Sequence, residues 1–450
     1  MDLAALPFTR AALHAAYAGG VTPGAVAAEA LRRIAAAQDP GIFLDVTPAQ
    51  DLAAQAASLP GFDPARFPLW GIPVAVKDNI AVAGRPMTAA CPAFAQVPDA
   101  DAHVVARLRA AGALIIGKTN LDQFATGLVG VRTPYPVPRN AVAPDRVPGG
   151  SSSGSAVAVA RGIVVAALGT DTAGSGRVPA ALNGIVGLKP SLGAVSTRGV
   201  VPACRSLDCV SVFAAGIEDA WAVFRAMAGE DRADPFSRPI AWAEPGAVPL
   251  RIAVPVPADL HLDDAPARAA WTQAEALLPD AVPARITPLL DAAKLLYDGP
   301  WVAERAAAFG DFAAAHPGAL HPVTQAIVAG AARFSAVDAF RGFYALAEHR
   351  RAAEDFFAEH DVLVVPSVPC FPTLAALEAD PFGPNARLGT YTNFVNLLDL
   401  AALAVPGPAR SDGLPAGITL IGPRGSDAAL AALGMQFAAR VADHRKARAA

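Results

Sequence analysis

The chain of 450 residues is poor in cysteine, since it contains only four scattered thiols. So few cysteines exclude the disulfide framework typical of small secreted domains. Cys204 and Cys209 have the spacing of half a metal site, but no second pair of Cys or His lies nearby. We therefore expect no metal, and we interpret these two residues, Cys91 and Cys370 as ordinary buried thiols.

The chain also lacks an excess of either charge and a long apolar run. Its 36 basic and 40 acidic side chains are intermixed, so no basic face for nucleic acid or for a membrane surface is predicted. No mostly apolar run reaches the roughly 20 residues that a membrane span needs. The first residues lack the charged and apolar regions of a secretory signal. We expect a cytoplasmic protein that binds neither nucleic acid nor membranes.

Hydrophobic residues, by contrast, are abundant at 53%, which is enough for a large core. Strand-like segments at 72–77, 114–117, 361–366 and 418–421 alternate with helix-like segments, among them two within 8–36 and one at 101–111. This alternation predicts an α/β fold with a central mixed, twisted β-sheet covered by helices on both faces. We predict one domain over residues 1–450, with a mostly helical subregion at about 218–355 and no C-terminal accessory domain.

Two loops rich in glycine and serine stand out. GGSSSGS at 149–155 and GTDTAGS at 169–175 flank an apolar segment long enough for either one buried helix or a helix followed by a strand. Glycine permits close approach and positive φ, while serine supplies hydroxyl groups. No phosphate-loop lysine follows Gly154, and no GxGxxG motif is present, so nucleotide binding is not supported. Serine hydroxyls beside backbone amides instead indicate acyl transfer, in which a hydroxyl is the nucleophile and the amides bind the oxyanion.

A serine nucleophile needs a base, and no histidine lies near either loop. The alternative is a lysine kept neutral by burial, as in Ser–Lys variants of the catalytic triad. Lys77 ends the strand-like stretch within GIPVAVKDNI at 71–80. Because burial disfavours the ammonium form, Lys77 is the predicted base.

These motifs, together with GTDTAGSGRVPAALNGIVGLKPS at 169–191, resemble the amidase signature family over most of the chain. The family spaces its two catalytic serines 24 residues apart, which selects Ser151 and Ser175 (175 − 151 = 24). The resemblance implies the amidase signature fold, with Ser175 as nucleophile and Lys77 as base. Ser151, in a cis peptide bond, would relay the proton, and no cofactor is implied.

The resemblance also implies an oxyanion hole, formed by the backbone amides of Thr172, Ala173, Gly174 and Ser175. Ala173 stands where the family more often has glycine, a change that an amide donor tolerates. Arg177 is either a substrate anchor or a brace for Asp171. We favour the brace, because members of the family carry this pair whatever their substrate.

Three further segments, at 120–130, 201–211 and 297–305, resemble the amidase domains of allophanate hydrolases. The resemblance implies that Tyr297 and Arg305 bind the substrate's carboxylate and that Gly127 contributes backbone to the pocket floor. A tiny anionic amide suits a fixed guanidinium. Pro300 is predicted to begin the helix that contains Arg305. In the alternative interpretation, Arg305 pairs with a surface acid and Tyr297 is a core residue.

The predicted activity is therefore cleavage of the terminal C–N bond of allophanate, with release of ammonia and an acyl-enzyme intermediate. The alternatives are an amidase for another small amide, biuret derivative or carbamate, a glutamine-dependent amidotransferase-type subunit, and a non-catalytic scaffold. The loop with Pro136 and Pro138 departs from the family, and the sequence leaves its effect on the pocket wall open. We also expect a homodimer. The carboxylated product is either handled by a separate protein or breaks down unaided, or the sequence is part of a longer enzyme.

Overall fold

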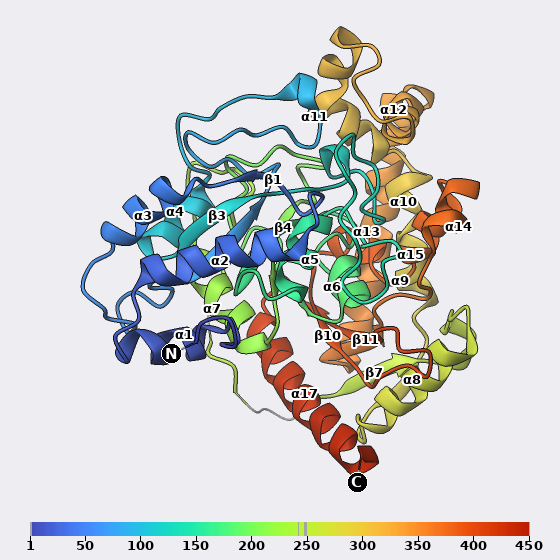
Figure 1. Ribbon diagram of the computed structural model, residues 1–450. Coiled ribbons are helices and arrows are strands. Elements are labelled where there is room, and N and C mark those ends of the chain that lie inside the picture. The colour runs from blue at the N-terminus through green and yellow to red at the C-terminus, as the bar shows by residue number, and fades with distance from the viewer. Residues whose placement is uncertain (1, 242, 247–249, 450) are drawn as a thin grey trace.

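A mixed sheet of 11 strands forms the centre of the molecule in the computed structural model, which describes residues 2–241, 243–246 and 250–449 (Figure 1). The order across the sheet is β1-β3-β2-β4-β6-β5-β10-β11-β9-β7-β8. The strands are β1 (Phe43–Val46), β2 (Pro73–Lys77), β3 (Leu114–Thr119), β4 (Ala166–Asp171), β5 (Val186–Lys189), β6 (Cys209–Ala214), β7 (Ile252–Pro255), β8 (Val282–Ala284), β9 (Val362–Pro366), β10 (Leu400–Pro406) and β11 (Gly417–Pro423). Strands from both ends of the chain thus share one sheet.

Helices connect and cover these strands. They are α1 (Arg10–Ala18), α2 (Pro23–Ala37), α3 (Ala49–Ala57), α4 (His103–Ala110), α5 (Ser153–Ala160), α6 (Val178–Asn183), α7 (Ile217–Met227), α8 (Ala265–Ala276), α9 (Thr287–Ala292), α10 (Lys294–Tyr297), α11 (Val302–Ala315), α12 (Pro322–Ala329), α13 (Ala336–Glu359), α14 (Leu374–Ala379), α15 (Gly383–Leu388), α16 (Asn393–Leu397) and α17 (Asp427–Ala449). The predicted helical subregion spans α7 to α13 and is interrupted by β7 and β8.

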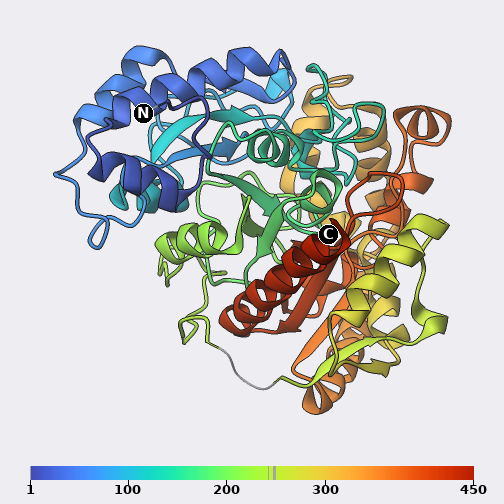
Figure 2. The same ribbon diagram turned by 60° about the horizontal axis from the view of Figure 1, so that its bottom comes forward.

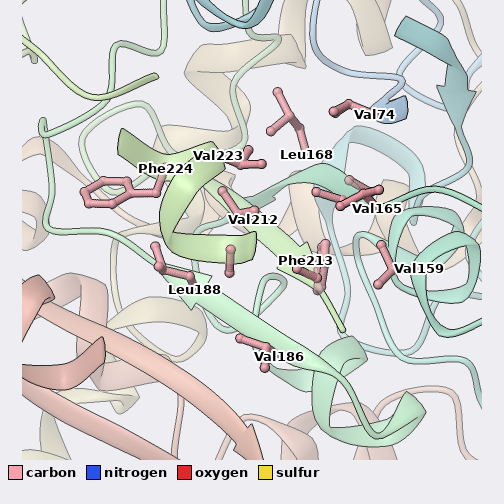
Figure 3. Close-up of a cluster of buried hydrophobic side chains, with 14 of the residues drawn as sticks. Val74, Val159, Val165, Leu168, Val186, Leu188, Val212, Phe213, Val223 and Phe224 are labelled. Atoms are coloured by element: carbon pink, nitrogen blue, oxygen red, sulfur yellow. The ribbon is translucent and has the colours of Figure 1, made fainter. Parts of the chain in front are cut away.

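The predicted α/β class and mixed sheet are confirmed. Strands β2, β3, β4 and β6 are buried at every position, so the sheet needs cover on both faces. Helices α7 and α17 contact each other, and α17 packs against β10 and β11, as the red C-terminal helix in Figure 2 shows. Helices α5 and α6 also contact each other and pack against β4 and β5 respectively. Figure 3 shows Val223 and Phe224 of α7 beside the apolar side chains of the central strands.

Local sequence signals placed several elements correctly. Thr22 caps α2 by accepting a hydrogen bond from the Ala25 amide, with Pro23 at the first helical position. The apolar segment between the two serine loops forms α5 followed by β4, which is one of the two arrangements that its length permits. No helix in the described part of the chain combines the length and apolarity that a bilayer crossing requires.

The pairing of β2 with β4 positions the candidate site. These two strands are parallel, with Val74 opposite Ala166 and Val76 opposite Leu168. Parallel neighbours end at the same edge of a sheet. Lys77, the last residue of β2, therefore lies beside the end of β4, where the second serine loop begins.

Candidate active site

Lys77 lies in the protein interior, and its amine reaches both serine-loop regions. Its Nζ lies 2.8 Å from Oγ of Ser151 and donates to Oγ1 of Thr170 at 2.7 Å. The side chain is fully buried. Burial lowers the pKa of Lys77 to about 7, although the negative charges of nearby carboxylates oppose this shift. A large fraction of Lys77 is therefore the neutral amine at neutral pH, as the sequence predicts.

The loop that carries Ser151 is held by the segment that precedes it. The peptide bond between Gly150 and Ser151 is cis, as the resemblance implies. The Ser151 carbonyl accepts a hydrogen bond from the Asp122 amide at 2.9 Å, and the Gly150 amide donates to the Leu128 carbonyl at 2.8 Å. A Cβ atom at Gly150 would collide with the Asp122 carboxylate. Glycine is therefore required where the loop passes this acid.

Ser175 lies on the loop between β4 and α6, in a buried position. Its hydroxyl donates to the Gly127 carbonyl at 3.4 Å. Gly127 thus contributes backbone beside the predicted nucleophile. A Cβ atom at Gly127 would lie 2.5 Å from Oδ2 of Asp122, so no larger residue fits without a shift.

Asp171 and Arg177 brace the loop of Ser175. Two guanidinium nitrogens of Arg177 donate to the two Asp171 oxygens, each at 2.9 Å. Both side chains are fully buried. Burial acts to raise the pKa of Asp171, but the guanidinium outweighs it and holds this pKa below its usual value. The brace interpretation is thus supported, because Arg177 is committed to Asp171 and to the Thr392 carbonyl.

Replacing Arg177 by alanine should destabilise the fold by about 3–5 kcal/mol, because Asp171 would remain buried without its counter-ion. Urea unfolding would measure the loss. The control is Arg351→Ala, which breaks the exposed pair with Glu354 and should cost about 1 kcal/mol or less. Equal losses in the two variants would contradict the bracing role.

Three of the four predicted oxyanion-hole amides are available. The amides of Thr172, Ala173 and Ser175 have no acceptor within the described ranges. Gly174 differs from the prediction, because its amide already donates to Oδ1 of Asp171 at 2.9 Å. Three candidate donors of the predicted oxyanion hole therefore remain.

Arg305 is fully buried and held by two hydroxyl groups. Its Nη1 donates to Oγ1 of Thr126 at 3.0 Å, and its Nη2 donates to the Tyr297 hydroxyl at 3.2 Å. Its Nε has no hydrogen-bond partner, and the partners of its other two nitrogens among the described residues are hydroxyl groups, not carboxylates. The alternative that Arg305 pairs with a surface acid is therefore wrong. Thr126 precedes Gly127, whose carbonyl contacts Ser175. The Arg305 guanidinium therefore binds the same chain segment that contacts the predicted nucleophile.

The predicted start of the Arg305 helix is also wrong. Helix α11 begins at Val302 after Trp301, and Pro300 lies before it. Tyr297 ends the short helix α10, which precedes α11. The turn between α10 and α11 nevertheless brings the Tyr297 ring to 5.3 Å from the Arg305 guanidinium carbon. The predicted pairing of these two side chains is thus present.

Asp208 belongs to the site but cannot be recognised from the sequence pattern. It accepts hydrogen bonds from the Thr172 hydroxyl at 2.5 Å and from the Ala203 and Cys204 amides. Burial raises the pKa of Asp208 to about 6. It ties the loop of the candidate oxyanion donors to the segment before β6. Its place in the 201–211 stretch is the only signal that the sequence offers.

A cavity of about 910 Å³ lies beside Tyr297. Tyr297 and Arg132 line it, as do Asn385 and Asn393. Lys77 and Ser175 do not line it, so the cavity adjoins the site without containing the candidate nucleophile. Asn393 follows Thr392, whose hydroxyl donates to the Ala173 carbonyl at 2.7 Å. Thr392 therefore lies between the cavity, which Asn393 lines, and the loop that carries the candidate oxyanion donors.

The unusual loop with Pro136 and Pro138 packs elsewhere. The Pro136 carbonyl accepts from the Asn120 side chain at 2.9 Å, and the Arg139 amide donates to Asp39. Pro136 and Pro138 do not line the 910 Å³ cavity. The loop therefore does not shape the wall of this cavity, because it packs towards the segment between α2 and β1.

The described cysteines form no disulfide; three of them are buried. No cluster of three or more His, Cys, Asp or Glu side chains suited to a metal occurs in the described ranges.

Comparison with known proteins agrees with the motifs. The model of the Amidase family matches residues 25–431. The urea amidolyase of Lachancea kluyveri is 48% identical over 380 residues, which are 83% of this chain and 21% of that protein. A glutamyl-tRNA(Gln) amidotransferase subunit of Symbiobacterium thermophilum is 36% identical over 96% of both chains.

The same fold is found among solved structures. Kluyveromyces lactis allophanate hydrolase superposes with a TM-score of 0.91 and 44% identity over 97% of this chain and 73% of that one. The chain spans about a fifth of the length of the urea amidolyases that it matches.

Proposed function

Because this chain belongs to the Amidase family, we propose that it hydrolyses the terminal amide of allophanate and releases ammonia. The observation that carries this proposal is the guanidinium of Arg305, which is fully buried without an ion-paired carboxylate in the described ranges. A buried guanidinium is stabilised best by an anion in direct contact, and Asp208 and Glu304 act on Arg305 without such a contact. A substrate carboxylate would supply that contact, with Tyr297 as a second donor. The name of the related allophanate hydrolase supports the same substrate.

The proposed reaction begins with Ser175 Oγ, which attacks the terminal urea carbonyl. Its proton passes to Ser151, whose own proton goes to the neutral amine of Lys77. The amides of Thr172, Ala173 and Ser175 stabilise the oxyanion. The proton then returns to the leaving nitrogen, which departs as ammonia and leaves an ester on Ser175. Water hydrolyses this ester to the N-carboxylated carbamate and restores the serine.

The rates of ammonia release from different amides distinguish an allophanate hydrolase from an amidase that acts on another small amide. The wild-type protein should release ammonia from allophanate faster than from biuret, a carbamate or a neutral aryl amide at the same concentration. Equal rates on the anionic and neutral amides would favour another amidase of the same family, since the guanidinium would then contribute no selectivity.

A glutamine-dependent amidotransferase component is the second candidate, and it rests on the 36% identity over 96% of both chains. Glutamine carries an ammonium group beside its carboxylate, so its site needs an acid close to the arginine. Arg305 has no ion pair in the part of the chain that the structure describes, although the negative charges of Asp208 and Glu304 act on it. Glutaminase activity that exceeds allophanate hydrolysis would favour this candidate.

The rate should rise with pH through about 7. Below this pH Lys77 is protonated and cannot accept the Ser151 proton, so kcat/KM should fall about tenfold per pH unit. Above it, the amine is neutral and the rate should reach a plateau. A pH profile of ammonia release from about pH 6 to 9 would show this single rising limb.

Asp208→Asn is the control for this assignment. The negative charge of Asp208 favours the ammonium form of Lys77, so its removal should move the rising limb to lower pH. If the rate of Asp208→Asn no longer rises with pH, the titrating group is Asp208, whose pKa is about 6, and not Lys77.

A further inference from the structure

Two side chains that line the cavity of about 910 Å³ also hold the backbone at Gly127. Nη1 of Arg132 donates to the Thr126 carbonyl at 3.0 Å, and Oδ1 of Asn385 accepts from the Leu128 amide at 2.8 Å. Arg132 is only 2% exposed and Asn385 only 8%. The Thr126 carbonyl belongs to the peptide group before Gly127, and the Leu128 amide belongs to the peptide group after it. Both peptide groups that flank this glycine are therefore bound by a side chain.

The backbone around Gly127 depends on such contacts for its conformation. Glycine restricts its own dihedral angles less than any other residue, and the Asp122 carboxylate leaves no room for a Cβ atom here. Shortly before it, Phe124 and Ala125 have φ of 50° and 52°, in the left-handed region that residues with a side chain rarely adopt. Backbone of this kind persists only where its surroundings enforce it. The two bonds to the flanking peptide groups are part of that enforcement.

The same two side chains join this segment to helix α15. Nη2 of Arg132 donates to the Pro381 carbonyl at 3.1 Å, and Asn385 lies near the start of α15. The guanidinium therefore bridges two carbonyl groups, those of Thr126 and Pro381. A planar guanidinium can hold two acceptors in a fixed geometry, whereas the ammonium group of a lysine does not reproduce this fork.

The segment held in this way makes two contacts of the candidate site. The carbonyl of Gly127 accepts from the Ser175 hydroxyl at 3.4 Å, and this carbonyl belongs to the same peptide group as the Leu128 amide. The Thr126 hydroxyl accepts from Nη1 of Arg305 at 3.0 Å. A shift of the peptide group before Gly127 would therefore move a partner of the guanidinium. A shift of the peptide group after it would move the partner of the nucleophile.

We propose that Arg132 and Asn385 are positioning residues of this amidase. Both act through Gly127 on the hydroxyl of Ser175, and Arg132 also acts through the neighbouring threonine on the guanidinium of Arg305. The inference rests on the proposed function, in which Ser175 is the nucleophile and Arg305 binds the substrate's carboxylate. A misplacement of about 1 Å at a reacting group can lower the rate roughly 100-fold, so contacts that fix its neighbours affect the chemistry directly.

Steady-state kinetics of Arg132→Ala and Asn385→Ala on allophanate and on a neutral amide test the proposal. Both variants should lose about 10- to 100-fold in kcat on both substrates, because the partner of the nucleophile is no longer fixed. Arg132→Ala alone should also raise KM severalfold, and only for allophanate, because a neutral amide has no carboxylate for Arg305. The control is Arg285→Ala, an exposed arginine that lines the same cavity, and it should leave kcat and KM unchanged. If either variant keeps kcat within a few-fold of this control, the proposal is wrong.

Chemical rescue separates positioning from a loss of folded protein. Because Arg132 lines the cavity, added guanidinium ions can enter the space that Arg132→Ala vacates. Guanidinium below denaturing concentrations should restore kcat of this variant severalfold, whereas methylammonium, which lacks the fork, should not. The same guanidinium salt should have no effect on Asn385→Ala. Absence of rescue together with an unchanged KM would assign Arg132 to the stability of the fold alone and overturn its positioning role. If circular dichroism shows that Arg132→Ala does not fold, Arg132→Lys, which keeps the charge without the fork, should show the same loss of kcat.

A probe that needs no amide substrate separates this inference from the proposed function. Phenylmethylsulfonyl fluoride sulfonylates an activated serine and releases fluoride and a proton, and peptide mass spectrometry measures the rate at Ser175. This rate should fall about tenfold or more in Arg132→Ala and Asn385→Ala, but not in Arg285→Ala. A wild-type protein that is labelled but releases no ammonia from allophanate would contradict the proposed substrate alone. Equal labelling rates in the wild type and all three variants would overturn the positioning role, whatever the substrate.

Discussion

Ammonia release from allophanate is expected to fall by about 10⁴–10⁶-fold when Ser175 is replaced by alanine. The reason is that the acyl-enzyme cannot form without this hydroxyl. The residual rate would come from substrate binding and the oxyanion donors alone. Steady-state ammonia production by the purified variant measures the effect.

Ser153→Ala is the matched control for this prediction. Ser153 lies in the first serine loop, is fully buried, and its hydroxyl has no partner in the described structure. Its removal should change kcat by no more than a few-fold. If Ser175→Ala keeps the activity of Ser153→Ala, then Ser175 is not the nucleophile, and the proposed mechanism is wrong.

Arg305→Gln is expected to lower kcat/KM for allophanate by roughly 30- to 4,000-fold. This range corresponds to about 2–5 kcal/mol for the loss of a buried partner of a charged group. The loss should appear mainly in KM if the guanidinium binds the ground state and the transition state equally. Kinetics with allophanate and with a neutral amide give the comparison.

The neutral amide is the control within the same variant. Because a neutral substrate has no carboxylate for Arg305, its slow turnover should change little or even improve. Arg305→Lys keeps the charge without the planar fork, so its loss on allophanate should be smaller than that of Arg305→Gln. Equal losses on both substrates would show that Arg305 supports the fold of the site rather than selecting an anion.

The sequence predicts that Lys77 lies beside the two serine loops, and the structure shows this arrangement because the signals for it are local. The spacing of 24 residues singles out Ser151 and Ser175, and the buried strand delivers Lys77 to the sheet edge. The predicted neutral amine agrees with a fully buried side chain whose pKa is about 7. The composition of a loop and the apolar pattern of a strand are properties of short segments, so they can be predicted without knowing which distant segments come into contact.

Other parts of the site depend on contacts between distant segments. The sequence does not pair Asp208 with Thr172 or Thr126 with Arg305, since 36 and 179 residues separate these pairs. Nor does it show that the Gly174 amide is occupied by Asp171, because this bond depends on the exact turn of the loop. The apolar run at 400–406 is similarly ambiguous between helix and strand, and only its pairing with β5 and β11 settles it.

The measurement that tests the mechanism most directly is mass spectrometry of peptides after rapid mixing with allophanate and acid quench. The proposed ester should appear as an acyl adduct, carbamoyl or carboxycarbamoyl, on the peptide that contains Ser175. It should form before steady state, decline as substrate is consumed, and be absent from Ser175→Ala. Rapid ammonia release with no adduct on this peptide, or an adduct on another serine, would contradict the mechanism.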